Sequence, residues 1–251
     1  MSGHSKWATI KRKKALVDAA RSKAWTKIIR ELTVAARDGG GDPSGNPRLS
    51  LAIDNAKAAN MPKDNIDRAI KKGSGDGKDA AAFQELVYEG YGPGGIAYLI
   101  LATTDNPTRT VGDIRPLFNK YGGNLGTSGS VSYLFERKGI IQLAKEGADE
   151  DALTLAAIDI GAEDIRSEDD VFEIETRFED LYAVRNGLEA AGFKPMSAET
   201  HYLPMTTVAA SEEHLIGNFK LMERLDDLDD VANVFNNLEM DETAVSVAES
   251  M

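Results

Sequence analysis

A glycine-rich segment near residue 75 divides the sequence into two parts whose patterns predict different types of structure. It reads Gly73-Ser74-Gly75-Asp76-Gly77-Lys78, a composition typical of flexible linkers. Before it, apolar residues recur at steps of three and four, as on the buried face of an α-helix. After it, short apolar runs typical of β-strands alternate with helical patterns. We therefore expect a helical domain over residues 1–80 and mixed α and β structure beyond it.

Three helices are predicted before the linker. The first covers residues 15–38 and ends at three successive glycines. The second begins after Asn46-Pro47, a pair that combines a capping side chain with a proline at the first helical position. The third begins at Pro62 and stops at Gly73. The first domain is thus predicted to consist of helices alone.

The remaining sequence predicts two α+β domains, one inserted in the other. Residues 139–203 read as strand, helix, strand, strand, helix and strand, which is the split βαβ order of a ferredoxin-like domain. The flanking segments 81–138 and 204–239 supply a discontinuous α+β domain, including a strand at residues 131–135, and residues 240–251 read as an acidic tail. The predicted fold class is α+β, with an N-terminal three-helix domain followed by two ferredoxin-like α+β domains, one inserted in the other.

Net charge changes sign between the two parts of the chain. The whole chain carries −12, but residues 1–80 hold 17 Lys and Arg against 9 Asp and Glu, whereas residues 81–251 hold 12 against 32. A domain of +8 attached to a body of −20 indicates nucleic-acid binding, because the basic part attracts phosphate while the acidic part discourages indiscriminate contact. The alternative is a solvated basic face without a ligand. Nucleic-acid binding is favoured because the charge of the whole first domain is opposite in sign to the charge of the rest of the chain.

Twelve residues of the basic part form the predicted nucleic-acid site. Several cluster on the first helix opposite its apolar face, at about 100° per residue. The others lie in the arm before it, where cations can neutralise phosphates and an indole can stack on a base or, alternatively, pack onto the helical core. No base-reading element is evident, so phosphate contact is the stronger prediction. The twelve residues are His4, Lys6, Trp7, Lys11, Arg12, Lys13, Lys14, Arg21, Lys23, Lys27, Arg30 and Arg37.

No catalytic, cofactor or metal site is predicted. The chain has no cysteine, and its histidines, His4, His201 and His214, are too widely separated for a metal-ligand spacing. Gly90-Tyr91-Gly92-Pro93-Gly94-Gly95 matches the dinucleotide-binding fingerprint, but an apolar strand pattern follows it where a helix is needed, so a hairpin turn is the better interpretation. The acidic run Asp226-Asp227-Leu228-Asp229-Asp230 is interpreted as solvated surface. The chain is therefore expected not to be an enzyme.

The sequence predicts a soluble, cytoplasmic protein with no membrane partner. Its longest apolar run, Ile96 to Ala102, is far shorter than the roughly 20 residues of a membrane-spanning helix, and the N-terminus lacks the apolar core of a signal peptide. The absence of cysteine fits a reducing compartment.

Five segments of the chain carry a family resemblance: residues 1–11 (MSGHSKWATIK), 33–37 (TVAAR) with 39–43 (GGGDP), 58–66 (AANMPKDNI), 88–95 (YEGYGPGG) and 122–126 (GGNLG). They resemble the corresponding segments of the YebC/PmpR family. The resemblance covers nearly the whole chain and implies a three-domain cytoplasmic protein, with a helical N-terminal domain and two α+β domains, one inserted in the other. It also implies a non-catalytic regulator of gene expression, since members are described as transcriptional regulators that bind DNA, while related members, including mitochondrial translational activators, act on the ribosome.

Two functions stay open at this point. The family description favours a DNA-binding transcriptional regulator. A ribosome- or RNA-associated translation factor that promotes elongation at stalling sequences suits phosphate contact with an aromatic arm at least as well, because RNA is recognised largely by shape and stacking. A pure protein-interaction scaffold would leave the basic domain unexplained. The expected partner is DNA, or ribosomal or transfer RNA with the ribosome, and a monomer is favoured because no paired half-site reader is visible.

Overall fold

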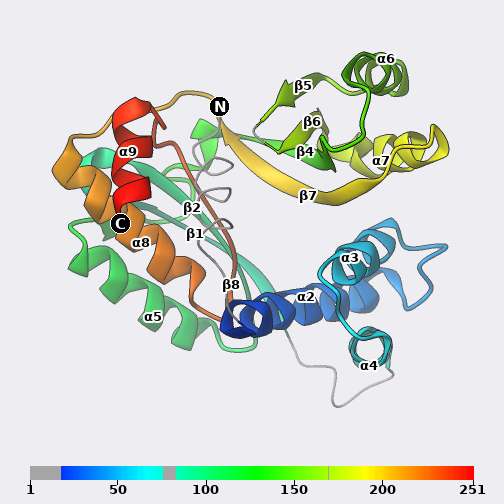
Figure 1. The fold of residues 1–251 in the computed structure, drawn as a ribbon. Coiled ribbons are helices and arrows are strands. Elements are labelled where there is room, and N and C mark those ends of the chain that lie inside the picture. Colours follow the sequence, from blue (N-terminus) through cyan, green and yellow to red (C-terminus); the bar gives the residue numbers. More distant parts are fainter. Residues whose placement is uncertain (1–17, 76–82, 169) are drawn as a thin grey trace. The chain divides into compact units, whose positions relative to one another are not determined.

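The computed structural model describes residues 18–75, 83–168 and 170–251 (Figure 1). The chain divides into two compact units. One comprises the described residues within 1–30, 81–136 and 202–251, and the other those within 31–80 and 137–201. The domain boundaries predicted from the sequence stay a prediction.

The three predicted helices are present. They are α2 (Asp18–Gly39), α3 (Pro47–Ala58) and α4 (Lys63–Ser74). The buried Asn46 joins the first two, because its side-chain oxygen accepts from the Leu49 amide at 3.0 Å while its Nδ2 donates to the Ala35 carbonyl at 2.7 Å. Helix α4 packs closely on α2 at Gly73, where a Cβ atom would lie 2.2 Å from the Thr33 carbonyl oxygen. A glycine is therefore required there.

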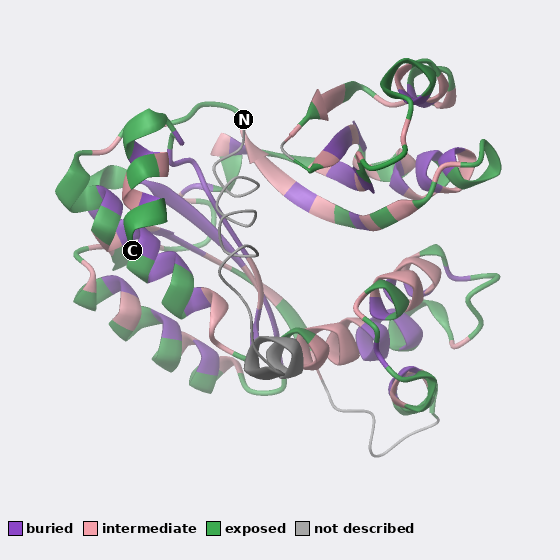
Figure 2. Ribbon diagram, in the orientation of Figure 1, coloured by how far each residue is buried: buried purple, intermediate pink, exposed green. Residues whose placement is uncertain are grey.

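The first unit contains a four-stranded antiparallel sheet in the order β3-β1-β2-β8. Its strands are β1 (Gln84–Tyr91), β2 (Ala97–Thr104), β3 (Asn124–Leu125) and β8 (Val231–Asn236). Helices α5 (Pro107–Lys120) and α8 (Glu212–Asp226) cover one face of this sheet (Figure 1). Residues on the facing sides of sheet and helices are buried, and the outer sides of the helices are exposed (Figure 2).

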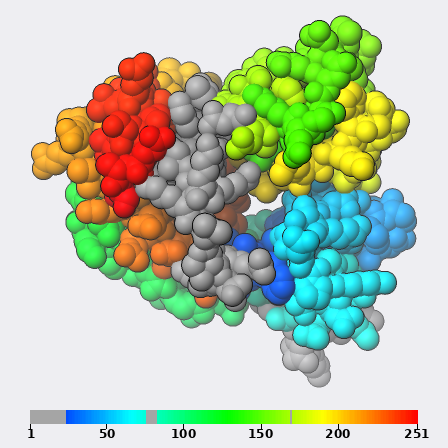
Figure 3. Space-filling view, in the orientation of Figure 1, coloured from blue at the N-terminus to red at the C-terminus, as the bar shows by residue number. Residues whose placement is uncertain are grey.

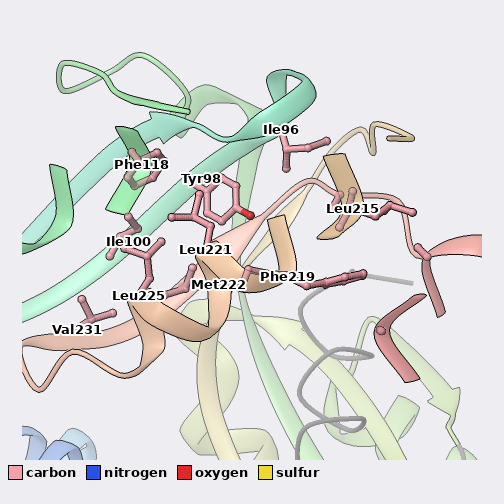
Figure 4. Close-up of a cluster of buried hydrophobic side chains, with 14 of the residues drawn as sticks. Ile96, Tyr98, Ile100, Phe118, Leu215, Phe219, Leu221, Met222, Leu225 and Val231 are labelled. Atoms are coloured by element: carbon pink, nitrogen blue, oxygen red, sulfur yellow. The ribbon is translucent and has the colours of Figure 1, made fainter. Parts of the chain in front are cut away.

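The core of this unit is built between the sheet and α8 (Figure 4). The fully buried Tyr98 of β2 packs edge-on against Phe118 of α5, with ring centroids 5.6 Å apart. Its hydroxyl group donates to the Asn218 side-chain oxygen at 2.9 Å, so the one polar atom of the ring has a partner. Phe219 and Leu225 of α8 complete the apolar layer.

The second sheet has the order β5-β6-β4-β7. Its strands are β4 (Phe135–Ala144), β5 (Asp164–Ser167), β6 (Val171–Arg177) and β7 (Pro195–Pro204), with helices α6 (Glu150–Ile160) and α7 (Leu181–Ala190) in the crossover connections. The chain order of strand, helix, strand, strand, helix and strand is the predicted one. The α+β fold class predicted from the sequence is confirmed.

Two local predictions differ from the structure. Residues 131–135 do not form a strand of the first sheet, because the Val131 and Ser132 amides donate to the Glu89 carboxylate instead of a neighbouring strand. Ser132–Leu134 form a 3₁₀ turn, and β4 then runs into the second sheet. Residues 240–251 are more than an acidic tail. They form α9 (Glu242–Ser250), whose Ala244 and Ala248 are buried in the core of the first unit.

Candidate nucleic-acid interface

The predicted site residues fall into three groups. Seven lie outside the described residues: His4, Lys6, Trp7, Lys11, Arg12, Lys13 and Lys14. Arg21 and Lys23 lie in α2, but their side chains are also outside the description. Lys27, Arg30 and Arg37 are described in full. All three belong to α2, Lys27 and Arg30 in the first compact unit and Arg37 in the second.

Lys27 and Arg30 contact carboxylates of their own chain. Lys27 Nζ lies 2.7 Å from Asp226 Oδ1, and Arg30 Nη1 lies 2.7 Å from Asp230 Oδ1. Arg30 also donates to the Thr103 carbonyl at 2.8 Å, and its guanidinium lies 5.6 Å from the ring centre of Phe83. The two side chains are only 21% and 16% exposed. The positive charge predicted for this part of α2 is thus largely compensated within the molecule.

Asp230, the partner of Arg30, is the central acceptor of a hydrogen-bond network. It is buried, and its two oxygens accept hydrogen bonds from two arginines and two threonines. Arg109 reaches it with Nε and Nη2 at 3.1 and 2.7 Å, and Thr104 and Thr110 donate at 3.0 and 2.8 Å. Burial alone would raise the pKa of the Asp230 carboxyl, but these donors together with Arg30 lower the pKa from 3.8 to about 2. The carboxylate is therefore fixed in its charged form.

The solvated-surface interpretation of residues 226–230 is wrong for Asp230. This residue precedes β8 directly, so its side chain meets the C-terminal end of β2 and the start of α5, where Thr104, Arg109 and Thr110 lie. Nothing in the acidic run itself distinguishes Asp230 from its exposed neighbour Asp229. The network was missed because Asp230 lies at least 120 positions from each of its partners in the sequence.

The basic residues at the end of α2 and in α4 are more exposed than Lys27 and Arg30. Arg37 is exposed and pairs with the adjacent Asp38, with Nε 2.7 Å from Oδ1. Lys63, Arg68 and Lys71 of α4 are exposed as well, and they were not among the predicted site residues. Arg68 and Lys71 are three positions apart and therefore neighbours on the surface of α4, a signal that was present in the sequence.

The glycine motif at residues 90–95 forms a turn between two strands. β1 ends at Tyr91, which pairs with Ala97 at the start of β2, and the Gly92 amide donates to the Ile96 carbonyl at 2.7 Å. Gly94 and Gly95 have φ angles of +73° and +79°, which favour glycine. The predicted hairpin is confirmed, and a strand follows the motif where a dinucleotide site needs a helix.

Within residues 18–75, 83–168 and 170–251, no group of three or more His, Asp and Glu side chains is arranged to hold a metal ion. None of the helices described in the structure has the length and apolar character needed to cross a bilayer.

Comparison with known proteins gives consistent matches over both parts of the chain. The family model "TACO1/YebC protein N-terminal domain" matches residues 5–76, and "TACO1/YebC second and third domain" matches residues 83–238. A protein of Geotalea uraniireducens is 52% identical over 96% of this chain and 97% of its own, and one of Haemophilus influenzae strain Rd is 53% identical over 97% and 99%. Both are named "Probable transcriptional regulatory protein".

A solved structure is similar as well. The crystal structure of a conserved hypothetical protein from Aquifex aeolicus superposes with a TM-score of 0.83 at 48% sequence identity, covering 89% of this chain and 92% of that one. The sequence resemblance described above is thus confirmed at the level of family and fold.

Proposed function

The chain belongs to the TACO1/YebC family, and we propose that it is a regulator of gene expression that binds DNA through its basic N-terminal segment. The observation that supports the proposal most is that relatives about half identical over nearly their full length are named "Probable transcriptional regulatory protein". The charge of +8 on residues 1–80 supplies the attraction for phosphate. The proposed activity is regulatory and needs no catalytic step.

The contacts of α2 refine where the nucleic acid is expected to bind. Lys27 and Arg30 hold α2 against Asp226 and Asp230 within one compact unit, so we assign them to anchoring the helix. The basic run Lys11-Arg12-Lys13-Lys14 then becomes the main candidate for phosphate contact. Exposed Arg68 and Lys71 of α4 are candidates for additional contacts.

A second candidate is an RNA- or ribosome-associated translation factor. It is favoured by the same ion pairs, because a helix that reads the major groove presents its side chains to base edges, whereas Lys27 and Arg30 contact carboxylates of their own chain. Phosphate-led binding suits structured RNA.

Ultraviolet crosslinking in growing cells separates these two candidates. The crosslinked protein is purified, and both the attached DNA and the attached RNA are sequenced. Enrichment of promoter DNA over bulk DNA is expected. Enrichment of ribosomal or transfer RNA, with crosslinks in the first 40 residues, would replace the DNA proposal by the translation one.

Alanine at Lys11, Arg12, Lys13 and Lys14 is expected to weaken binding to DNA of any sequence. Each lost phosphate contact should reduce the slope of log affinity against log salt by about 0.9, because fewer counterions are released on binding. Affinity is measured by fluorescence anisotropy over a range of salt concentrations. The matched control removes four exposed cations elsewhere, Arg115, Lys194, Lys220 and Arg224, and thus changes net charge equally. Equal slopes for the two variants would show that the basic run does not make the phosphate contacts.

A further inference from the structure

Helix α6 exposes two large apolar side chains that the fold does not use. Leu155 and Ile158 are 67% and 60% exposed, whereas Leu153 and Ala157 of the same helix are completely buried in the core of the second unit. Leu155 and Ile158 are three positions apart and therefore neighbours on one face of the helix. The outward face of α6 is drawn as exposed in Figure 2, and the space-filling view shows this segment at the surface (Figure 3).

Acidic residues flank this apolar pair. Asp151 and Asp159, four positions before and after Leu155, are exposed on the same face. The surrounding segment is acidic as well, since residues 139–203 contain 16 Asp and Glu against 5 Lys and Arg. The face is thus a small apolar surface with a carboxylate rim.

We propose that this face of α6 docks a basic amphipathic helix of a partner protein. The pair of apolar side chains three positions apart suits the recognition of one helix by another, and the carboxylate rim complements lysine and arginine beside the partner's apolar stripe. The same rim repels the phosphates of nucleic acid and the equally acidic face of a second copy of this chain. The surface is therefore separate in residues and in charge from the proposed nucleic-acid site.

The test uses the full chain and a synthetic fluorescein-labelled peptide of leucine and lysine, about 18 residues long, with its leucines on one helical face. A second peptide has the same composition in an order that breaks the amphipathic pattern. Binding is followed by fluorescence anisotropy. The amphipathic peptide is expected to bind the wild-type chain at least tenfold more tightly than the rearranged one. Equal binding of the two peptides would reduce the interaction to charge attraction and overturn the proposal.

Substitutions test whether the amphipathic peptide binds to this face of α6. The double variant L155S/I158S is expected to weaken binding of the amphipathic peptide about tenfold or more, because both apolar contacts are lost. Met205→Ser, at a side chain 61% exposed outside α6, is the matched control and should leave affinity unchanged. Circular dichroism checks folding, and Leu155→Lys, which keeps helix propensity and repels the peptide, replaces the double variant if serine unfolds the helix. Unchanged affinity in the folded variants would overturn the proposal.

Two further variants test the role of the carboxylate rim and the identity of the segment that binds to this face of α6. Asp151→Asn combined with Asp159→Asn should lower affinity and flatten its salt dependence, and an unchanged salt dependence would contradict the role of the rim. The chain with alanine at Lys11, Arg12, Lys13 and Lys14 should bind the peptide as the chain with alanine at Arg115, Lys194, Lys220 and Arg224 does, because both lose four positive charges. Tighter binding by the first of these variants would mean that the chain's own basic run occupies the face, which would overturn the proposal of a partner helix.

Discussion

Replacing Asp230 by alanine is expected to lower the free energy of unfolding by about 3–5 kcal/mol. The substitution removes the shared acceptor of Arg30 and Arg109, as well as that of the Thr104 and Thr110 hydroxyl groups. Arg30 and the two buried hydroxyl groups then lose the Asp230 carboxylate, while Arg109 keeps only its ion pair with the exposed Asp105. Leaving such groups without their acceptor costs more than the pairing itself contributes. The measurement is urea denaturation followed by circular dichroism, with the midpoint and slope fitted separately.

Asp229→Ala is the matched control for this prediction. Asp229 is the adjacent residue, carries the same charge and is exposed. Its replacement should change the free energy of unfolding by no more than about 0.5 kcal/mol, as for other surface substitutions. If the Asp229 variant loses as much stability as the Asp230 variant, the effect comes from the charge of the acidic run and not from the hydrogen-bonded network.

The same network predicts how stability depends on pH. The pKa of Asp230 is about 2 in the folded chain and 3.8 ordinarily, so the folded state favours the ionised form. A lowered carboxyl pKa contributes stability that is fully present above about pH 4 and is lost as the pH falls toward about 2. The contribution is about 2 kcal/mol. Wild type should therefore lose about this much more stability than Asp230→Ala between pH 5 and pH 2, and parallel curves would contradict the assignment.

The sequence predicted the elements of this fold better than the contacts between distant segments. Asn46-Pro47 placed the start of α3 at the observed residue, and the glycine motif before Ile96 was read as a hairpin. Both predictions rest on local chemistry, capping in one case and glycine conformation in the other. The order of strands and helices in residues 139–203 was also readable, because each element carries its own periodicity.

Contacts between distant residues could not be read in this way. Lys27 and Arg30 are predicted from the sequence to lie on the polar face of the first helix, but their partners Asp226 and Asp230 are about 200 positions away. A sequence pattern shows that a cation lies outside the helical core, and it does not show whether water, phosphate or a carboxylate lies opposite. Ala244 and Ala248 of α9 were missed for a related reason, because small apolar residues in an acidic segment give a weak periodic signal.

Glu89 gives the second large expected effect, because one buried carboxylate fixes an entire loop. Its Oε1 accepts from the Gly129 amide at 2.7 Å, and its Oε2 accepts from the Val131 and Ser132 amides at 2.7 and 2.8 Å. Burial alone would raise the pKa of the Glu89 carboxyl, but these three amides hold the pKa below its ordinary value. The loop between β3 and β4 thus depends on an acceptor-only group.

Glu89→Gln is therefore expected to cost about 2–4 kcal/mol despite its nearly identical shape. One carboxylate oxygen becomes an NH₂ group that faces backbone donors, so at least one of the three amides loses its acceptor. Hydrogen exchange should accelerate selectively at Gly129, Val131 and Ser132, because the loop opens before the sheet does. Glu239→Gln, at an exposed position, is the control and should leave both stability and exchange unchanged. Slow exchange at the three amides in the Glu89 variant would show that turn geometry alone holds the loop, and the carboxylate would then have no organising role.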